Sequence, residues 1–133
     1  MAEVPVAIVR GAYEAFGRGD VPAVLAVLAP DVEWVESEAT GIPTRGTHTG
    51  PQQVAENVFA VVPQDWREFA LVPEDFFADG DTVIVRGRVR AVAKATGKSM
   101  DAPFVHVFTF AGGKIQRMTN HHDTALWVQT LST

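Results

Sequence analysis

Segments of alternating apolar and polar residues, separated by glycine-containing turns, restrict the fold of this chain more than any other feature. They are WREFALV (66–72), TVIVRGRVRAVA (82–93), APFVHVFTF (102–110) and KIQRMTNHH (114–122). The turns between them contain Asp79-Gly80, Thr96-Gly97 and Gly112-Gly113. Alternation is typical of half-buried strands, and turns of this kind join hairpins. The second part of the chain therefore predicts a largely antiparallel sheet.

The start of the chain has a helical pattern instead. Apolar residues recur at helical spacing over residues 4–16. Asp20 can cap a second helix, which we expect to run through AVLAVLA to Pro30. DVEWVES (31–37) then alternates like a strand.

A further helix is expected before the strands. Thr49 and Gln52 fit a capping box that opens a helix over 51–62, and Pro63 would end it. Helices followed by a meander of strands predict an α+β fold with the helices on one face of the sheet. We expect a single domain over residues 1–133.

Composition excludes several classes of function. The net charge of −5 argues against a broad basic surface for nucleic acid. The absence of cysteine excludes a disulfide framework, a thiolate zinc site and a cysteine nucleophile. No apolar run approaches the ~20 residues of a membrane span, and the N-terminal segment has no apolar core of a signal peptide. We therefore expect a cytoplasmic protein that binds neither nucleic acid nor membrane.

The turns also predict which side chains share a face of the sheet. The Gly-Gly turn pairs Phe104 with His121, and the Thr-Gly turn pairs His106 with Gly87; paired residues share a face. The predicted inner face, which should meet the helices, holds Val83, Val85, Gly87, Val89, Phe104, His106, Phe108, Phe110, Ile115, Arg117, Thr119 and His121. The predicted outer face, either wet or an oligomer interface, holds Arg86, Arg88, Arg90, Val105, Val107, Thr109, Gln116, Met118, Asn120 and His122.

This register predicts which of the polar side chains, the histidines and Asp123, share a face of the sheet. His121 and His122 point to opposite faces and cannot readily chelate one ion, so no metal site is expected. His106 lies beside Gly87, which has no side chain to fill the space. If the last strand continues to Asp123, then His106, His121 and Asp123 converge on one apolar face. A slip of one residue would undo this arrangement.

Each candidate has a plainer alternative. Asp123 precedes TALWVQ, which looks helical, so it can cap a helix, act as a general base in an apolar pocket, or do both. His106 is either a buried core histidine or a pocket residue that orients a substrate. Tyr13 and Trp34 are either core aromatics or pocket walls.

Other charged residues favour structural roles. Glu33, Glu36 and Glu38 are expected to be solvated, and the three arginines of residues 86–90 to form surface ion pairs. The sequence contains no phosphate-binding glycine loop, H-E-x-x-H pattern or Ser-His-Asp order. No cofactor is expected.

Three stretches together resemble a known family. They are GAYEAFGRGDVPAVLAVLAPDVEW (11–34), GIPTRGTHTGPQQVAENVF (41–59) and FVHVFTFAGGKIQRMTNHHDTALWVQ (104–129). They resemble the nuclear-transport-factor-2-like superfamily, and within it the SnoaL-like branch related to polyketide cyclases and ketosteroid isomerases. The resemblance implies a strongly curved, cystatin-like sheet around N-terminal helices, an interior apolar pocket, and homodimers formed through the outer sheet face.

The resemblance also implies a reaction. In the polyketide cyclases, an aspartate near the end of the last strand is the acid–base group of an aldol closure, and Asp123 in HHDTA matches its place. His106 matches a pocket histidine of the preceding strand. Ketosteroid isomerases use two aspartates, where this chain has Trp34 and a position at or beside Val105. Steroid isomerase activity is therefore not expected.

The sequence thus predicts a small, cofactor-independent enzyme that transfers protons on an apolar carbonyl compound. Asp123 would remove and return a proton, while His106, with His121 or a bound water, would orient it and stabilise an enolate. The predicted apolar walls are Tyr13, Trp34, Phe59, Trp66, Phe104 and Phe108. Two alternatives stay open: a dimeric small-molecule-binding protein without turnover, and a dimerisation domain whose own side chains fill the pocket.

Overall fold

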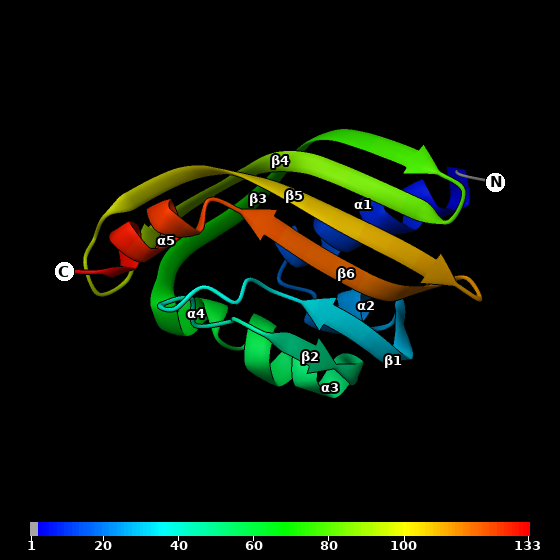
Figure 1. Ribbon diagram of the computed structural model, residues 1–133, viewed down its shortest axis with the longest axis horizontal. Helices are drawn as coiled ribbons and strands as arrows, with labels where there is room; N and C mark the ends of the chain where they lie inside the picture. The colour runs from blue at the N-terminus through cyan, green and yellow to red at the C-terminus, as the bar shows by residue number, and fades with distance from the viewer. Residues whose placement is uncertain (1–2) are drawn as a thin grey trace.

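A six-stranded, strongly curved sheet forms the scaffold of the protein, whose computed structural model describes residues 3–133 (Figure 1). The strands are β1 Leu28–Val35, β2 Thr47–Thr49, β3 Trp66–Asp79, β4 Thr82–Ala93, β5 Ser99–Ala111 and β6 Lys114–His122. Their order in the sheet is β2-β1-β6-β5-β4-β3. Only the β1–β6 pair is parallel within the described residues. The predicted α+β fold with a curved, largely antiparallel sheet is confirmed.

Helices cover one side and the ends of this sheet. They are α1 Glu3–Gly17, α2 Val21–Leu25, α3 Gly50–Val54, the π-helical turn η1 Ala55–Phe59, α4 Val62–Asp65 and α5 Thr124–Leu131. In Figure 1, α1 crosses behind the long strands, and α5 lies next to the end of β6. Of the helices within residues 3–133, none has the length and apolar character needed to cross a membrane.

The core lies between the sheet and these helices. Val9 of α1, Val54 of α3, Val85 of β4, Phe104 of β5 and Ile115 of β6 are each buried almost completely. Full burial of such a side chain is worth roughly 1.5–3 kcal/mol relative to exposure. The alternating apolar residues of β4 and β5 therefore hold the helices against the concave face.

The second helix is shorter than predicted. Asp20 does cap it, accepting a hydrogen bond from the backbone N–H of Ala23 at 3.2 Å. The helix ends at Leu25, however, and Leu28 begins β1, where it pairs with Ile115 of β6. Pairing with β6 and burial of Leu28 outweigh the helical pattern of AVLAVLA.

The helix after the loop also begins differently from the prediction. Thr49 makes no capping bond with its side chain; its backbone N–H donates to Oε1 of Gln53 at 2.8 Å. The predicted capping box between Thr49 and Gln52 is therefore wrong. Pro63 does not end this helix but lies in the first turn of α4, where a missing N–H costs no helical bond.

The β4–β5 pairing differs from the predicted one by two residues. His106 pairs with Val85, and Phe104 pairs with Gly87. A shift of two residues leaves every side chain on its predicted face, because the side-chain period of a strand is two. Val83, Val85, His106 and Phe108 are accordingly buried on the inner face.

Gly87 marks a tight bend rather than empty space. A Cβ atom at this position would collide with the backbone oxygen of Val72, and it would lie 2.9 Å from the Phe104 ring and from Cα of Pro73. The β3–β4 register also shifts between Pro73 and Asp75, opposite this glycine. The predicted free volume beside Gly87 is thus wrong, since β3 and Phe104 occupy it.

A bulge in β6 changes the inner face of that strand. Phe110 pairs with Ile115 as predicted, but the next pair is Thr109 with Arg117, which leaves Gln116 as an extra residue. Beyond it the register is displaced by one residue, and every side chain changes face. The inner face of β6 therefore carries Met118, Asn120 and His122, and the predicted assignment of Arg117, Thr119 and His121 to that face is wrong.

The outer face of the sheet is rich in ion pairs. Arg86 pairs with Asp75 at 2.6 Å, while Arg88 and Arg90 both lie beside Asp101. These are the surface ion pairs that the sequence predicted for the three arginines. A homodimer formed through this face stays a prediction.

Candidate functional site

Two adjoining cavities lie between the concave face of the sheet and the helices. Their volumes are about 70 Å³ and about 50 Å³. Phe16, Trp34, Phe59, Leu71 and His106 line both of them, so the two are neighbouring parts of one interior space. A mostly apolar interior with a few inward polar groups is the usual form of a small-molecule site.

All six side chains predicted as apolar walls line this interior space. Tyr13 and Phe108 line the smaller cavity, Trp66 and Phe104 the larger one, and Trp34 and Phe59 both. Several are in aromatic contact; the Trp34 and Phe59 ring centroids, for example, are 5.6 Å apart. Their contact with a ligand stays a prediction.

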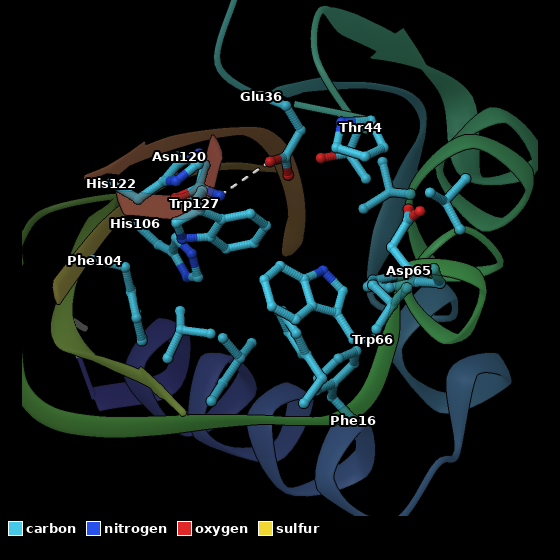
Figure 2. A pocket seen from close by; sticks show the side chains of 18 of the residues that line it. Phe16, Glu36, Thr44, Asp65, Trp66, Phe104, His106, Asn120, His122 and Trp127 are labelled. Atoms are coloured by element: carbon cyan, nitrogen blue, oxygen red, sulfur yellow. Dashed lines mark hydrogen bonds between the residues drawn. The ribbon is translucent and has the colours of Figure 1, made fainter. Parts of the chain in front are cut away.

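Glu36 is a buried carboxylate that faces the larger cavity, with only 6% of its surface exposed (Figure 2). Nε1 of Trp34 donates to its Oε2 at 2.7 Å, and Nδ2 of Asn120 donates to its Oε1 at 2.9 Å. Burial raises the pKa of Glu36, although both hydrogen bonds work in the opposite direction. A carboxylate with a raised pKa in an apolar space is well suited to exchanging a proton with a bound molecule.

The expectation that Glu36 is solvated is therefore wrong, while Glu33 and Glu38 are indeed exposed. The signal was available in the sequence. Val32 and Trp34 alternate along β1 and are apolar residues that should face the core, and Glu36 is the next position in the same alternation, directly after the strand. Strict alternation extended by one more step places Glu36 inside.

His106 faces the same interior and is held by Tyr13. The Tyr13 hydroxyl and Nδ1 of His106 are 2.6 Å apart. Burial raises the pKa of Tyr13. Burial, with a smaller effect of His122 and against an opposing effect of the neighbouring Asn120 side chain, lowers the pKa of His106 to about 3. Both groups are therefore neutral near pH 7, and the hydroxyl donates to Nδ1. The remaining ring hydrogen of His106 is then on Nε2.

Asn120, His122 and Trp127 form a second group of polar side chains, which we call the polar end of the larger cavity. In Figure 2 these three residues lie together beside Glu36 and His106. Oδ1 of Asn120, both ring nitrogens of His122 and Nε1 of Trp127 are buried and have no hydrogen-bond partner within residues 3–133. Each such atom costs about 1–3 kcal/mol unless another molecule satisfies it. The sequence interpretation missed all three residues.

The polar end is uncharged near neutral pH. Burial lowers the pKa of His122 to about 4, although Asp123 opposes this shift. No Lys or Arg is among the described residues that line the larger cavity, where Asp65 is the only carboxylate besides Glu36. Burial raises the pKa of Asp65 as well, against the effect of Lys94. The site therefore offers hydrogen bonds without a compensating positive charge.

Asp123 and His121 do not join this site. Asp123 is exposed and caps α5, accepting a hydrogen bond from the backbone N–H of Leu126 at 3.1 Å. It lines neither interior cavity, so the predicted convergence of Asp123 with His106 on one face is wrong. His121 is exposed on the outer side of β6. It lines a groove that shares Glu36, Asn120 and His122 with the larger cavity, but it does not line that cavity, so its predicted place beside His106 is also wrong. The bulge at Gln116 explains both corrections, because it gives the inward position to His122.

No arrangement of three or more His, Asp or Glu side chains able to hold a metal ion occurs in the described part of the chain. The expectation that the protein needs no cofactor stays a prediction.

Comparison with known proteins adds the family. A model of the SnoaL-like domain matches residues 9–118. The chain belongs to this SnoaL-like family. The matched range includes Tyr13, Glu36 and His106, whereas all three residues of the polar end lie beyond it.

Solved structures of similar proteins agree with this assignment. A nuclear-transport-factor-2-like protein of unknown function from Burkholderia pseudomallei is 34% identical, with a TM-score of 0.92 and 98% of each chain covered. TerC, co-crystallised with polyporic acid, is 29% identical, with a TM-score of 0.89 and 98% of this chain and 99% of TerC covered. A candidate polyketide cyclase from Xanthomonas campestris is 25% identical, with a TM-score of 0.85 and 98% of each chain covered. A comparison with curated proteins gives no significant match.

Proposed function

We propose that this SnoaL-like protein is a cofactor-independent enzyme that transfers a proton on an apolar carbonyl compound, with Glu36 as its acid–base group. One observation carries the proposal: the Glu36 carboxylate is buried against an apolar cavity and is aimed by two hydrogen-bond donors, Trp34 and Asn120. This role replaces the one predicted for Asp123.

The proposed reaction begins with the ionised form of Glu36. Its carboxylate takes a proton from the carbon next to the carbonyl; the C–H bond breaks, and its electron pair forms an enolate. Neutral His106, whose Nε2–H is fixed by the Tyr13 bond, donates to the enolate oxygen. Glu36 then returns the proton, so the enzyme ends in its starting state.

Two of the relatives support this proposal. The candidate polyketide cyclase shares the fold over almost the whole chain and favours chemistry at a carbonyl compound. The co-crystallisation of TerC with polyporic acid supports the binding of an organic molecule by a protein of this fold.

Hydrogen–deuterium exchange tests the proposal without knowledge of the natural substrate. Acetophenone, 1-indanone and 2-tetralone are incubated with the protein in D₂O, and loss of the α-hydrogen signal is followed by NMR. We expect the protein to accelerate exchange of at least one compound. Glu36→Gln should slow that exchange by about 100-fold or more, as expected for loss of a general base.

Glu38→Gln is the matched control, since Glu38 is an exposed glutamate two residues along the same segment. It should exchange at the wild-type rate. Wild-type exchange by Glu36→Gln would contradict the proposal. Binding of these compounds without any acceleration would also contradict it and would favour a ligand-binding protein without turnover.

A further inference from the structure

The polar end of the cavity has four buried polar atoms with which a bound molecule can form hydrogen bonds. They belong to Asn120, His122 and Trp127, and none has a hydrogen-bond partner among residues 3–133. Only 6% of the Trp127 surface is exposed, so solvent outside the protein does not reach its indole N–H. The rings of His122 and Trp127 are 4.6 Å apart between centroids, so their polar atoms belong to one small region.

The chemistry of these atoms restricts what can bind. The Trp127 indole N–H is a donor only. The Asn120 amide is oriented by its Nδ2, which donates to Glu36, and its Oδ1 is an acceptor only. A neutral His122 ring supplies one donor and one acceptor. Together they offer two donors and two acceptors. A ligand that satisfies both kinds must carry an acceptor, such as a carbonyl oxygen, and a donor, such as a hydroxyl group, close to each other.

Charge restricts the ligand further. An anionic ligand at the polar end would lie next to Asn120, whose side chain also holds the Glu36 carboxylate. The described lining of this cavity contains no Lys or Arg to balance a second negative charge. Burial of an unpaired charge is strongly unfavourable. An uncharged ligand avoids that cost.

We propose that the polar end selects an uncharged hydroxy-carbonyl group on an apolar molecule, and that it discriminates against the corresponding carboxylate. This inference rests on the proposed function, because it names the substrate class of the same cavity. The carbonyl oxygen accepts from Trp127 and His122, and the hydroxyl donates to Oδ1 of Asn120, so three of the four atoms gain a partner. The carbon next to that carbonyl then lies on the side of the cavity that Glu36 lines.

Three single-ring probes of similar size test this selection by isothermal titration calorimetry at pH 7. They are 2-hydroxyacetophenone, an uncharged ketone with its hydroxyl on the carbon next to the carbonyl, mandelate, which is an anion, and ethylbenzene, which has no hydrogen-bonding group. We expect 2-hydroxyacetophenone to bind about 10-fold more tightly than either of the others, since each hydrogen bond is worth roughly two- to tenfold in affinity. Equal or tighter binding of mandelate would overturn the inference, as would the absence of binding by 2-hydroxyacetophenone.

Two adjacent histidines provide a matched pair of variants. His122→Phe keeps a ring against Trp127 but removes both ring nitrogens, whereas His121→Phe changes a residue on the outer face. The first should weaken 2-hydroxyacetophenone binding by roughly two- to tenfold, and the second should not change it. Trp127→Phe removes only the indole N–H and should have the same effect as His122→Phe. Neither inward variant should weaken ethylbenzene binding; an equal loss for both probes would overturn the inference.

These binding measurements need no turnover, so their failure differs from failure of the proposed function. Mandelate binding as tightly as the ketone, together with slow exchange by Glu36→Gln, would overturn only the substrate class. Selective ketone binding with wild-type exchange by Glu36→Gln would uphold the substrate class and overturn the role of Glu36.

Discussion

The Tyr13 hydroxyl lies 2.6 Å from Nδ1 of His106 and joins α1 to β5 across 93 residues of sequence. The two rings are also nearly parallel, with an angle of 5° between their planes. This contact anchors the first helix to the concave face of the sheet, and it determines which nitrogen of His106 carries the hydrogen that faces the proposed site.

Tyr13→Phe should therefore change both the stability of the protein and the tautomer of the His106 ring. The variant leaves Nδ1 of buried His106 without its donor, which should lower the free energy of unfolding by about 1–3 kcal/mol. It also removes the constraint that keeps the hydrogen on Nε2. Urea denaturation measures the first effect, and ¹⁵N NMR of the His106 ring measures the second. An unchanged tautomer in Tyr13→Phe would show that another contact fixes the ring.

Stability should fall in mild acid because of His106. Its pKa is lowered from 6.5 to about 3, so between these values the unfolded chain binds more protons than the native protein. The free energy of unfolding should thus be insensitive to this group above pH 6.5 and decline as the pH falls below it. His106→Gln should show a shallower decline, by up to about 1.4 kcal/mol per pH unit. Urea denaturation between pH 7 and pH 5 measures how the free energy of unfolding changes with pH. The variant His121→Gln, at an exposed position, should keep the wild-type change of free energy with pH.

Glu36 should have the opposite pH dependence. Its pKa is raised in the native protein, so above its ordinary value of 4.5 the native protein holds the proton more tightly than the unfolded chain does. The free energy of unfolding of the wild type should therefore fall as the pH rises from 4.5 through the raised pKa, because the buried carboxyl loses its proton. Glutamine has no proton to lose, so the stability of Glu36→Gln relative to wild type should increase with pH and then level off. A pH-independent difference between the two in urea denaturation would contradict the burial of the charge, and Glu38→Gln should show no such trend.

Asp123 should matter for stability but not for chemistry. Asp123→Ala removes the cap of α5 and should lower the free energy of unfolding by about 0.5–2 kcal/mol. Asp123→Asn should retain most of the cap, because asparagine is an equally good capping residue. Neither variant should slow α-hydrogen exchange in the folded protein. Loss of exchange in well-folded Asp123→Asn would restore the role that the sequence predicted for this residue.

Gly87→Ala should be strongly destabilising. The added Cβ would collide with the backbone oxygen of Val72, and neither strand can move away without breaking the sheet. Overpacking of this kind costs about 1–3 kcal/mol and occasionally more. Thermal and urea denaturation measure the loss. Gly97→Ala is a useful contrast: that glycine has a φ of 71° in an exposed turn with open space around it, so its cost comes from the backbone alone.

Much of the fold could be predicted from the sequence because local signals and tertiary structure agree there. The turns at Asp79-Gly80 and Gly112-Gly113 join consecutive antiparallel strands, and Asp20 caps the helix that follows it. Where the prediction was wrong, a contact from elsewhere in the chain decided the structure. Leu28 is in a strand because Ile115 pairs with it, although its own neighbours favour a helix.

The site was less predictable than the fold. His106 and the aromatic walls follow from the alternation of β5 and from residue type. Asn120 and His122 depend on a bulge at Gln116, and no feature of KIQRMTNHH marks that residue as the extra one. Glu36 is a different case, because its inward position follows from Val32 and Trp34. Its inward position was not predicted, because glutamate is generally expected to be solvated.

The bulge at Gln116 means that β6 contains two interleaved sets of side chains, and the register selects which set the interior receives. The present register presents Met118, Asn120 and His122; the unbulged register would present Arg117, Thr119 and His121. Deletion of a single residue near Gln116 could thus exchange a neutral binding surface for a cationic one without any substitution in the pocket itself. Insertions and deletions at such a position are therefore a route to new specificity that comparison of aligned pocket residues would overlook.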